Sequence, residues 1–188
     1  QWFGNCVTAL SSHDHWLHEG FATYYSWLAE RELFGEERYE ELLMAAESYS
    51  IEDARTNEYP LHHSKTSSIA FYEKGAWFLH MLKAQIGEEA FKESIRAYLD
   101  KYKYNTVTTR NFKLTCEKVS GKDLTQFFEQ WLERPSMPII KVTAEYEPNE
   151  SKFTMRFEQA QKVNSRLPEY SIKIPFVIYT DIDTYSYE

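Results

Sequence analysis

The sequence HDHWLHEGFATYYSWL occupies residues 13–28. Its apolar residues recur three or four positions apart, which predicts an amphipathic helix. In such a helix His15 and Glu19 share one face, at a spacing that can hold a metal ion. The positions that continue this face are small or polar, namely Ala22, Thr23, Ser26 and Glu30. Gly20 costs about 1 kcal/mol in a helix relative to Ala, and its presence beside Glu19 suggests that this face lines a cleft.

The spacing alone leaves a second interpretation open. His18 points about 100° away from Glu19 around a helix, and His13 lies at or before the predicted helix start. The same residues are therefore also compatible with a solvated, polar helix start that binds no metal.

Helical patterns extend through the first three quarters of the chain. Apolar residues recur at helical spacing over residues 39–49 and 91–102. The predicted helix boundaries are Gly87 as a C-cap, Thr108 as the N-cap of a helix to about Val119, and Asp123 with Gln126 as a capping box.

The pattern changes to period two after Pro135 and Pro138, which stop the last helix. Apolar and polar residues alternate over 140–146 and 153–157, which predicts two strands joined by a turn. A third strand is predicted over 172–179, where Pro175 suggests an edge or a bulge.

Composition narrows the classes of partner. The 188 residues include 21 basic and 29 acidic side chains, for a net charge of −8. Nucleic acids and anionic membranes bind proteins mainly through positive charge, so neither is expected as a partner. No run of about 18 apolar residues is present, so no membrane-spanning segment is predicted in this chain.

Two motifs make the chain resemble a known enzyme family. The run QWFGN at residues 1–5, followed by WLHEGFATY at residues 16–24, is similar to the gluzincin metallopeptidases of the aminopeptidase N and leukotriene hydrolase type. In that family a helix carries H-E-x-x-H, a QWFGN-like run follows the second His, and a Glu comes 18 residues after that His. Eighteen residues precede Glu19, so the resemblance implies that Glu19 is the third zinc ligand and that H-E-x-x-H would end just before Gln1.

The second motif is SSIAFYEKGA at residues 67–76, which resembles the family's Y-E-K-G segment. The tyrosine of that segment donates a hydrogen bond to the oxyanion, so the resemblance implies this catalytic role for Tyr72. Without the resemblance, Tyr72 would be one of 14 tyrosines and a core residue by default. Further candidates beside the zinc or in the cleft are His18, Thr23 and Lys74.

The chain departs from the family pattern at three histidines. His18 stands where the family usually has Asn, and it either makes a comparable hydrogen bond or alters water access. His13 and His15 stand where acidic or aromatic residues are more common, and either could capture a metal ion adventitiously. His62 and His63 are expected to be loop residues.

The resemblance covers about residues 1–142 and implies a mainly α fold. Residues 1–137 would form the C-terminal helical part of a thermolysin-like catalytic domain. Residues 138–188 would be the first strands of a truncated antiparallel β-sandwich domain. The implied parent protein is a zinc aminopeptidase that removes N-terminal residues from peptides with metal-activated water. This chain lacks H-E-x-x-H, so it is expected to bind its zinc weakly or not at all and to be inactive alone.

Two other functions stay open, and one association is expected. A relative with this fold could be a non-catalytic binding scaffold, or an ester or epoxide hydrolase with the same zinc site. Apolar residues near Trp2, Phe3 and Trp16, together with an open strand edge at 172–179, favour self-association of the chain.

Overall fold

The computed structural model describes residues 2–161, 163–165, 167–174, 176–179 and 184–187. The chain divides into two compact units, Gln1–Met137 and Pro138–Glu188. The first is built from helices and the second from β-hairpins, so the predicted mainly α fold is confirmed. Within the described part of the chain, none of the helices has the length and apolar character needed to cross a membrane.

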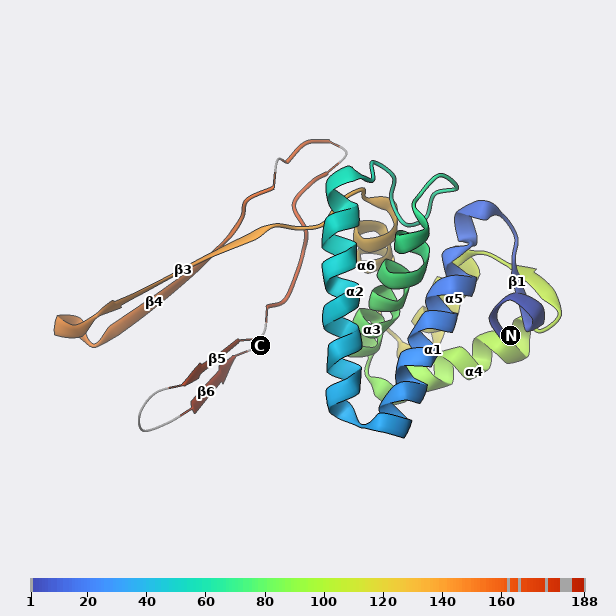
Figure 1. Ribbon diagram of the computed structural model, residues 1–188, viewed down its shortest axis with the longest axis horizontal. Coiled ribbons are helices and arrows are strands. Elements are labelled where there is room, and N and C mark those ends of the chain that lie inside the picture. The colour runs from blue at the N-terminus through green and yellow to red at the C-terminus, as the bar shows by residue number, and fades with distance from the viewer. Residues whose placement is uncertain (1, 162, 166, 175, 180–183, 188) are drawn as a thin grey trace. The chain divides into compact units, whose positions relative to one another are not determined.

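The first unit is a helical assembly with one small parallel sheet (Figure 1). Its helices are α1 (Trp16–Phe34), α2 (Glu36–Thr56), α3 (Gly75–Ile86), α4 (Glu88–Tyr102), α5 (Thr109–Ser120) and α6 (Thr125–Phe128). Shorter turns are η1 (Trp2–Cys6), η2 (Ser12–Asp14), η3 (Ala70–Lys74) and η4 (Glu129–Glu133). Strand β1 (Val7–Ala9) pairs in parallel with β2 (Asn105–Val107). Helix α1 packs against both α2 and α3.

Aromatic side chains fill the core of this unit. Trp16, at the start of α1, is completely buried, and its ring meets the edges of Phe78 and Phe112. Its indole N–H donates to Thr109 Oγ1 at 2.9 Å, so its polar atom is satisfied. Phe3 stacks on Phe21 with ring centroids 4.1 Å apart. Burying a large apolar side chain contributes about 1.5–3 kcal/mol, so these contacts hold the start of α1 firmly in place.

The helix boundaries largely follow the sequence signals. Gly87 ends α3 in a positive-φ conformation (φ 93°), and Thr108 caps α5 through a capping box with Asn111. The capping box predicted for Asp123 is wrong, because α6 begins one residue later than that box requires and Leu124 is its N-cap. Asp123 instead accepts a hydrogen bond from the Thr125 N–H at 2.8 Å. Such a local turn competes with regular capping, and a four-residue helix gains little from either.

The second unit contains two antiparallel hairpins. Strand β3 (Ile140–Glu147) pairs with β4 (Lys152–Gln159) across the turn η5 (Pro148–Glu150), which confirms the two strands and the turn that the sequence predicted. Strand β5 (Phe176–Tyr179) pairs with β6 (Thr184–Tyr187). The third predicted strand is therefore shorter than expected, since residues 172–174 are not in a strand. Pro175 lies outside the described residues.

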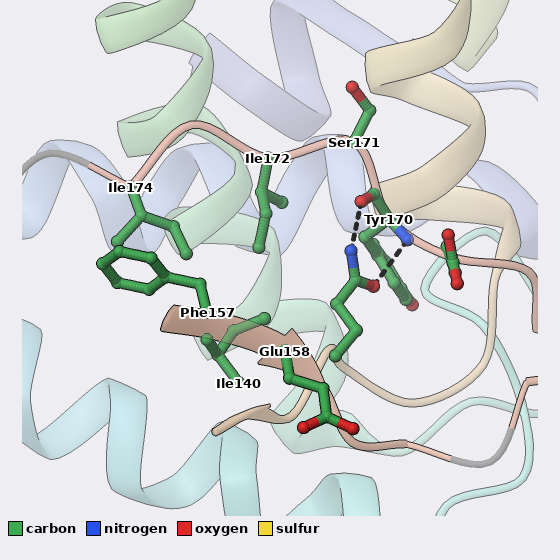
Figure 2. A pocket seen from close by; sticks show the side chains of 9 residues that line it. Ile140, Phe157, Glu158, Tyr170, Ser171, Ile172 and Ile174 are labelled. Atoms are coloured by element: carbon green, nitrogen blue, oxygen red, sulfur yellow. Dashed lines mark hydrogen bonds between the residues drawn. The ribbon is translucent and has the colours of Figure 1, made fainter. Parts of the chain in front are cut away.

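Residues 172–174 contribute to a pocket instead of a strand (Figure 2). The pocket has a volume of ≈ 420 Å³, and Ile172 and Ile174 line it together with Phe157 of β4. The side-chain amide of Gln159 holds the segment beside β4, because it donates to the Tyr170 carbonyl at 2.6 Å and accepts from the Tyr170 N–H at 2.8 Å. The apolar lining of the pocket and the Gln159 amide take the place of regular hydrogen bonds between strands here.

Candidate functional site

The structure brings Glu19 and Tyr72 together. Glu19 lies in the first turn of α1, and Tyr72 lies in η3, the turn that leads into α3. The Tyr72 hydroxyl lies close enough to the Glu19 carboxylate for their interaction to raise the pKa of Tyr72 above its ordinary value. Both side chains reach solvent, with exposed fractions of 26% for Glu19 and 41% for Tyr72. Two residues from separate elements thus form one accessible polar pair.

The turn that carries Tyr72 has π geometry. The Gly75 N–H bonds to the carbonyl of Ala70, five residues earlier, and to that of Tyr72, and not to the carbonyl four residues earlier. Ser67 supports the start of this segment, since its hydroxyl accepts from the Ala70 N–H at 3.0 Å. Single π turns are found frequently at functional sites, where the extra residue changes the direction of a side chain.

The sequence suggested that the helix face beside Gly20 lines a cleft. In the structure, the backbone of Gly75 packs directly against Gly20. A Cβ atom placed on Gly20 would lie 2.9 Å from both the Cα and the carbonyl carbon of Gly75. The missing side chain therefore admits the backbone of the turn that carries Tyr72. It lets two helical segments approach each other beside Glu19.

Lys74 anchors the Tyr72 turn at its other end. Its ammonium group donates to the Ser136 carbonyl at 3.3 Å, at the end of the helical unit. Burial lowers the pKa of Lys74 to about 8, although the negative charge of Asp53 opposes the shift. The ammonium group is therefore used within the protein interior as a donor to the backbone.

Two histidines flank Glu19. His15 lies at the N-terminus of α1, with Nε2 3.6 Å from Glu19 Oε1 and its ring edge-on to Phe71. His18 accepts a hydrogen bond from the Ala9 N–H at 2.6 Å through Nε2. This acceptor role places the proton of a neutral His18 on Nδ1. Burial, and then the neighbouring His15, lower the pKa of His18. Thr23 follows one turn later on α1 and is half-buried.

The pair fits one part of a metal site. A carboxylate is a ligand that Zn²⁺ accepts, and Glu19 combines solvent access with a neighbouring tyrosine hydroxyl. Within the part of the chain that the structure describes, no group of three or more His, Cys, Asp or Glu side chains could hold a metal ion. Glu19 is therefore a candidate for one ligand of a larger site.

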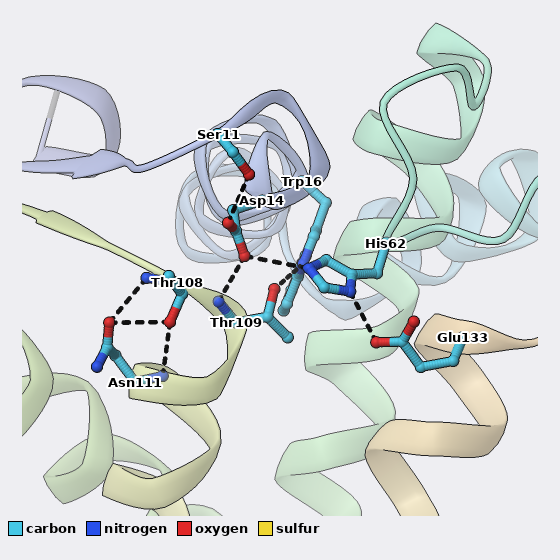
Figure 3. A network of polar contacts seen from close by, with 8 residues as sticks. All are labelled: Ser11, Asp14, Trp16, His62, Thr108, Thr109, Asn111 and Glu133. Atoms are coloured by element: carbon cyan, nitrogen blue, oxygen red, sulfur yellow. Dashed lines mark hydrogen bonds and ion pairs between the residues drawn. The ribbon is translucent and has the colours of Figure 1, made fainter.

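A polar network that the sequence did not reveal fixes the start of α1 (Figure 3). Asp14 is buried and accepts from the Thr109 N–H at 2.7 Å and from the Ser11 hydroxyl at 2.9 Å. The imidazole of His62 bridges two carboxylates, with Nε2 3.2 Å from Asp14 and Nδ1 2.7 Å from Glu133. His62 is a loop residue, as predicted, but it ties the loop to two other segments, η2 through Asp14 and η4 through Glu133.

The two charges in this network stabilise each other. Burial alone would raise the pKa of Asp14, but hydrogen bonds from Thr109 and Ser11 and the charge of His62 outweigh it and lower the pKa. The hydrogen bond to Glu133 raises the pKa of His62 against the effect of burial, and Asp14 adds to the rise. Asp14 and His62 are therefore both ionised at pH values between the pKa of Asp14 and the pKa of His62.

Replacing His62 with Ala should destabilise the chain more in acid than in base. A group whose pKa is raised by folding contributes stability that is present below its unfolded pKa of about 6.5 and is lost as the pH rises through the folded pKa. We expect a loss of about 1–3 kcal/mol at pH 5.5 and a smaller loss at pH 9, measured by urea unfolding.

The neighbouring His63→Ala change is the matched control, since the His63 ring stacks on Tyr59 and lacks the two carboxylate contacts of His62. Equal losses for His62→Ala at the two pH values would contradict the charge-bridge interpretation.

Comparison with known proteins gives a consistent result. The model of the family described as "Peptidase family M1 domain" matches residues 1–131. "Probable aminopeptidase 2" of Sulfurisphaera tokodaii is 32% identical over 169 residues, which are 85% of this chain and 21% of that protein. The chain therefore spans about a fifth of the length of this curated relative.

Solved structures agree with the sequence comparison. The crystal structure of Legionella pneumophila aminopeptidase A in complex with aspartic acid is 25% identical, with a TM-score of 0.65 over 94% of this chain and 19% of that one. The M1 zinc metallopeptidase from Deinococcus radiodurans is 26% identical, with a TM-score of 0.62 over 73% of this chain and 31% of that one.

Proposed function

Because this chain belongs to peptidase family M1, we propose that it contributes Glu19 and Tyr72 to the active site of a zinc-dependent aminopeptidase. The observation that carries the proposal is that these two side chains lie close enough to interact. Glu19 and Tyr72 belong to two separate sequence motifs and lie on different elements. Their side chains nevertheless lie close together, and both reach solvent. The names of the relatives support aminopeptidase activity, with peptides that have a free N-terminus as substrates.

Glu19 would act as a zinc ligand. Its position in the first turn of a helix that is anchored by Trp16 and Asp14 holds the carboxylate still, which favours metal binding over a mobile side chain. When bound, zinc lowers the pKa of water and polarises the carbonyl group of the substrate. The other ligands and the general base of the family belong to H-E-x-x-H, which this sequence does not contain.

Tyr72 would donate its hydroxyl hydrogen to the developing oxyanion. A tyrosine hydroxyl is protonated at neutral pH, and the interaction with Glu19 raises its pKa further, so the proton is available for donation. During the reaction the hydroxyl would turn from the Glu19 carboxylate to the oxygen of the scissile carbonyl. The π turn and Lys74 hold the backbone of Tyr72 during this change.

The test compares this chain with a longer protein. Residues 1–188 alone should not hydrolyse an aminoacyl-amide substrate, because one ligand cannot hold zinc tightly and the general base is missing. A protein in which the same chain follows an H-E-x-x-H helix should cleave that substrate, lose activity with a chelator and regain it with Zn²⁺. A panel that includes ester and epoxide substrates separates a peptidase from the alternative hydrolases.

Two results would contradict the proposal. Chelator-sensitive hydrolysis by the pure 188-residue chain would mean that the site lies elsewhere in it. A longer protein that binds zinc but cleaves no amide would support a scaffold or another hydrolase.

A further inference from the structure

We propose that Gly20 and Gly75 are positioning residues for catalysis, and that their backbone contact sets the distance between Glu19 and Tyr72. The inference rests on the proposed function, because it concerns the same pair of side chains. It assigns a role to two residues that have no functional group of their own. Neither glycine touches the substrate, so both act through the residues beside them.

The contact between the two glycines is closer than side chains allow. A Cβ on Gly20 would lie 2.9 Å from the Cα and carbonyl carbon of Gly75 and 3.2 Å from its oxygen. A Cβ on Gly75 would lie 3.0 Å from the Cα of Gly20. All of these neighbours are backbone atoms, which cannot rotate away as the end of a flexible side chain can. An added methyl group at either position must therefore push the two segments apart.

Backbone conformation does not explain these glycines. Gly75 has ordinary right-handed helical dihedrals (φ −63°, ψ −44°), and Gly20 lies inside α1 and is not among the positive-φ residues. Glycine in a helix costs about 1 kcal/mol relative to alanine. The close approach of α1 to the Tyr72 turn is a local benefit that can offset this cost.

The contact lies next to both proposed catalytic side chains. Glu19 directly precedes Gly20 on α1. On the other segment, the Gly75 N–H is bonded to the Ala70 carbonyl, so Gly75 closes the π turn that contains Tyr72. A displacement of Gly75 is therefore transmitted to Tyr72 through that turn, and a displacement of Gly20 to Glu19 through α1.

The expected displacement is large enough to matter. Carbon atoms in contact prefer a separation of about 3.5–4.0 Å, so a methyl group at 2.9 Å requires a shift of roughly 0.6–1 Å. Misplacement of a catalytic group by about 1 Å can reduce a rate about 100-fold. We therefore expect Gly75→Ala to lower kcat by about 10- to 100-fold in the active longer protein, while KM and bound zinc stay close to their original values. Gly20→Ala should lower kcat by a similar factor and also weaken zinc binding, because it displaces Glu19.

A double-mutant cycle with Tyr72→Phe separates positioning from general damage. If Gly75→Ala acts through Tyr72, it should have little further effect on kcat once the hydroxyl is gone. Val107→Ile on β2 is the matched control, because it also adds one methylene to a buried site, at a position outside the proposed active site. It should lower the melting temperature without lowering kcat per folded molecule, as counted by titration with a tight-binding inhibitor.

Failure of this inference and failure of the proposed function give different results. If the reductions in kcat caused by Gly75→Ala and Tyr72→Phe multiply in the double variant, the inference is overturned and the proposed function still stands. Normal kcat in Tyr72→Phe alone would instead contradict the proposed function. If neither alanine variant folds, the contact serves stability alone and the inference is also overturned.

Discussion

A Glu19→Gln variant of the longer enzyme is expected to lose its bound zinc and nearly all of its aminopeptidase activity. A neutral amide is a poor ligand for a divalent cation, whereas a carboxylate binds zinc directly. Glutamine has nearly the same shape as glutamate, and its amide oxygen can still accept from a nearby hydroxyl, so the local structure should persist while the metal is lost. Metal analysis of the purified protein, together with kcat for an aminoacyl-amide substrate, measures both effects.

Glu30→Gln provides the control for this change. Glu30 lies on the same helix, and its carboxylate pairs with Arg38 at 2.7 Å, away from the start of the helix. Its replacement removes the same charge from α1 and should preserve zinc content and activity. A Glu19→Gln enzyme that retains stoichiometric zinc would show that Glu19 is not a ligand.

Local patterns in the sequence were sufficient for much of the fold. The periodicity of residues 13–28 predicted α1, because its large apolar residues, such as Trp16 and Phe21, lie on the face that is buried in the core. The alternation after residue 138 predicted the hairpin, in which Val142 faces Phe157 and Tyr146 faces Phe153. In both cases the signal and the structure that it specifies lie within about twenty residues of each other.

The role of each site residue was harder to predict. Spacing drew attention to Glu19 and His15, but Tyr72 emerged only from the resemblance of its Y-E-K-G segment to a family. The structure then supplied what neither approach offered, namely the proximity of the Tyr72 hydroxyl to Glu19. Tyr72 is partly exposed and occurs in a π turn, and no periodic pattern predicts such a turn.

Contacts between distant segments could not be predicted. His62 was expected to be an ordinary loop residue because its partners, Asp14 and Glu133, are 48 and 71 positions away. Gly20 was interpreted as the wall of a cleft because nothing near it in the sequence indicates that Gly75 approaches it. Hydrogen bonds and close contacts of this kind depend on tertiary packing, which a single sequence encodes only collectively.

Tyr72→Phe in the longer enzyme is expected to keep the fold and the zinc while kcat falls steeply. Loss of one oxyanion donor commonly costs about 2.7–4 kcal/mol, which corresponds to about 100- to 1000-fold in kcat. KM should change little, because the hydroxyl would contact the carbonyl oxygen mainly after it becomes negative. Steady-state kinetics and metal analysis of the same preparation provide the measurement.

Zinc content determines how a loss of activity in Tyr72→Phe is interpreted. The hydroxyl has two potential partners, the oxyanion in the reaction and Glu19 in the resting protein. If its main role were to hold Glu19 in place, the phenylalanine variant would lose zinc along with activity. If its role is to donate to the oxyanion, zinc stays and only kcat falls. Tyr104→Phe, at a tyrosine that is 85% exposed, should change neither quantity, and a Tyr72→Phe enzyme with the same kcat as this control would refute the oxyanion role.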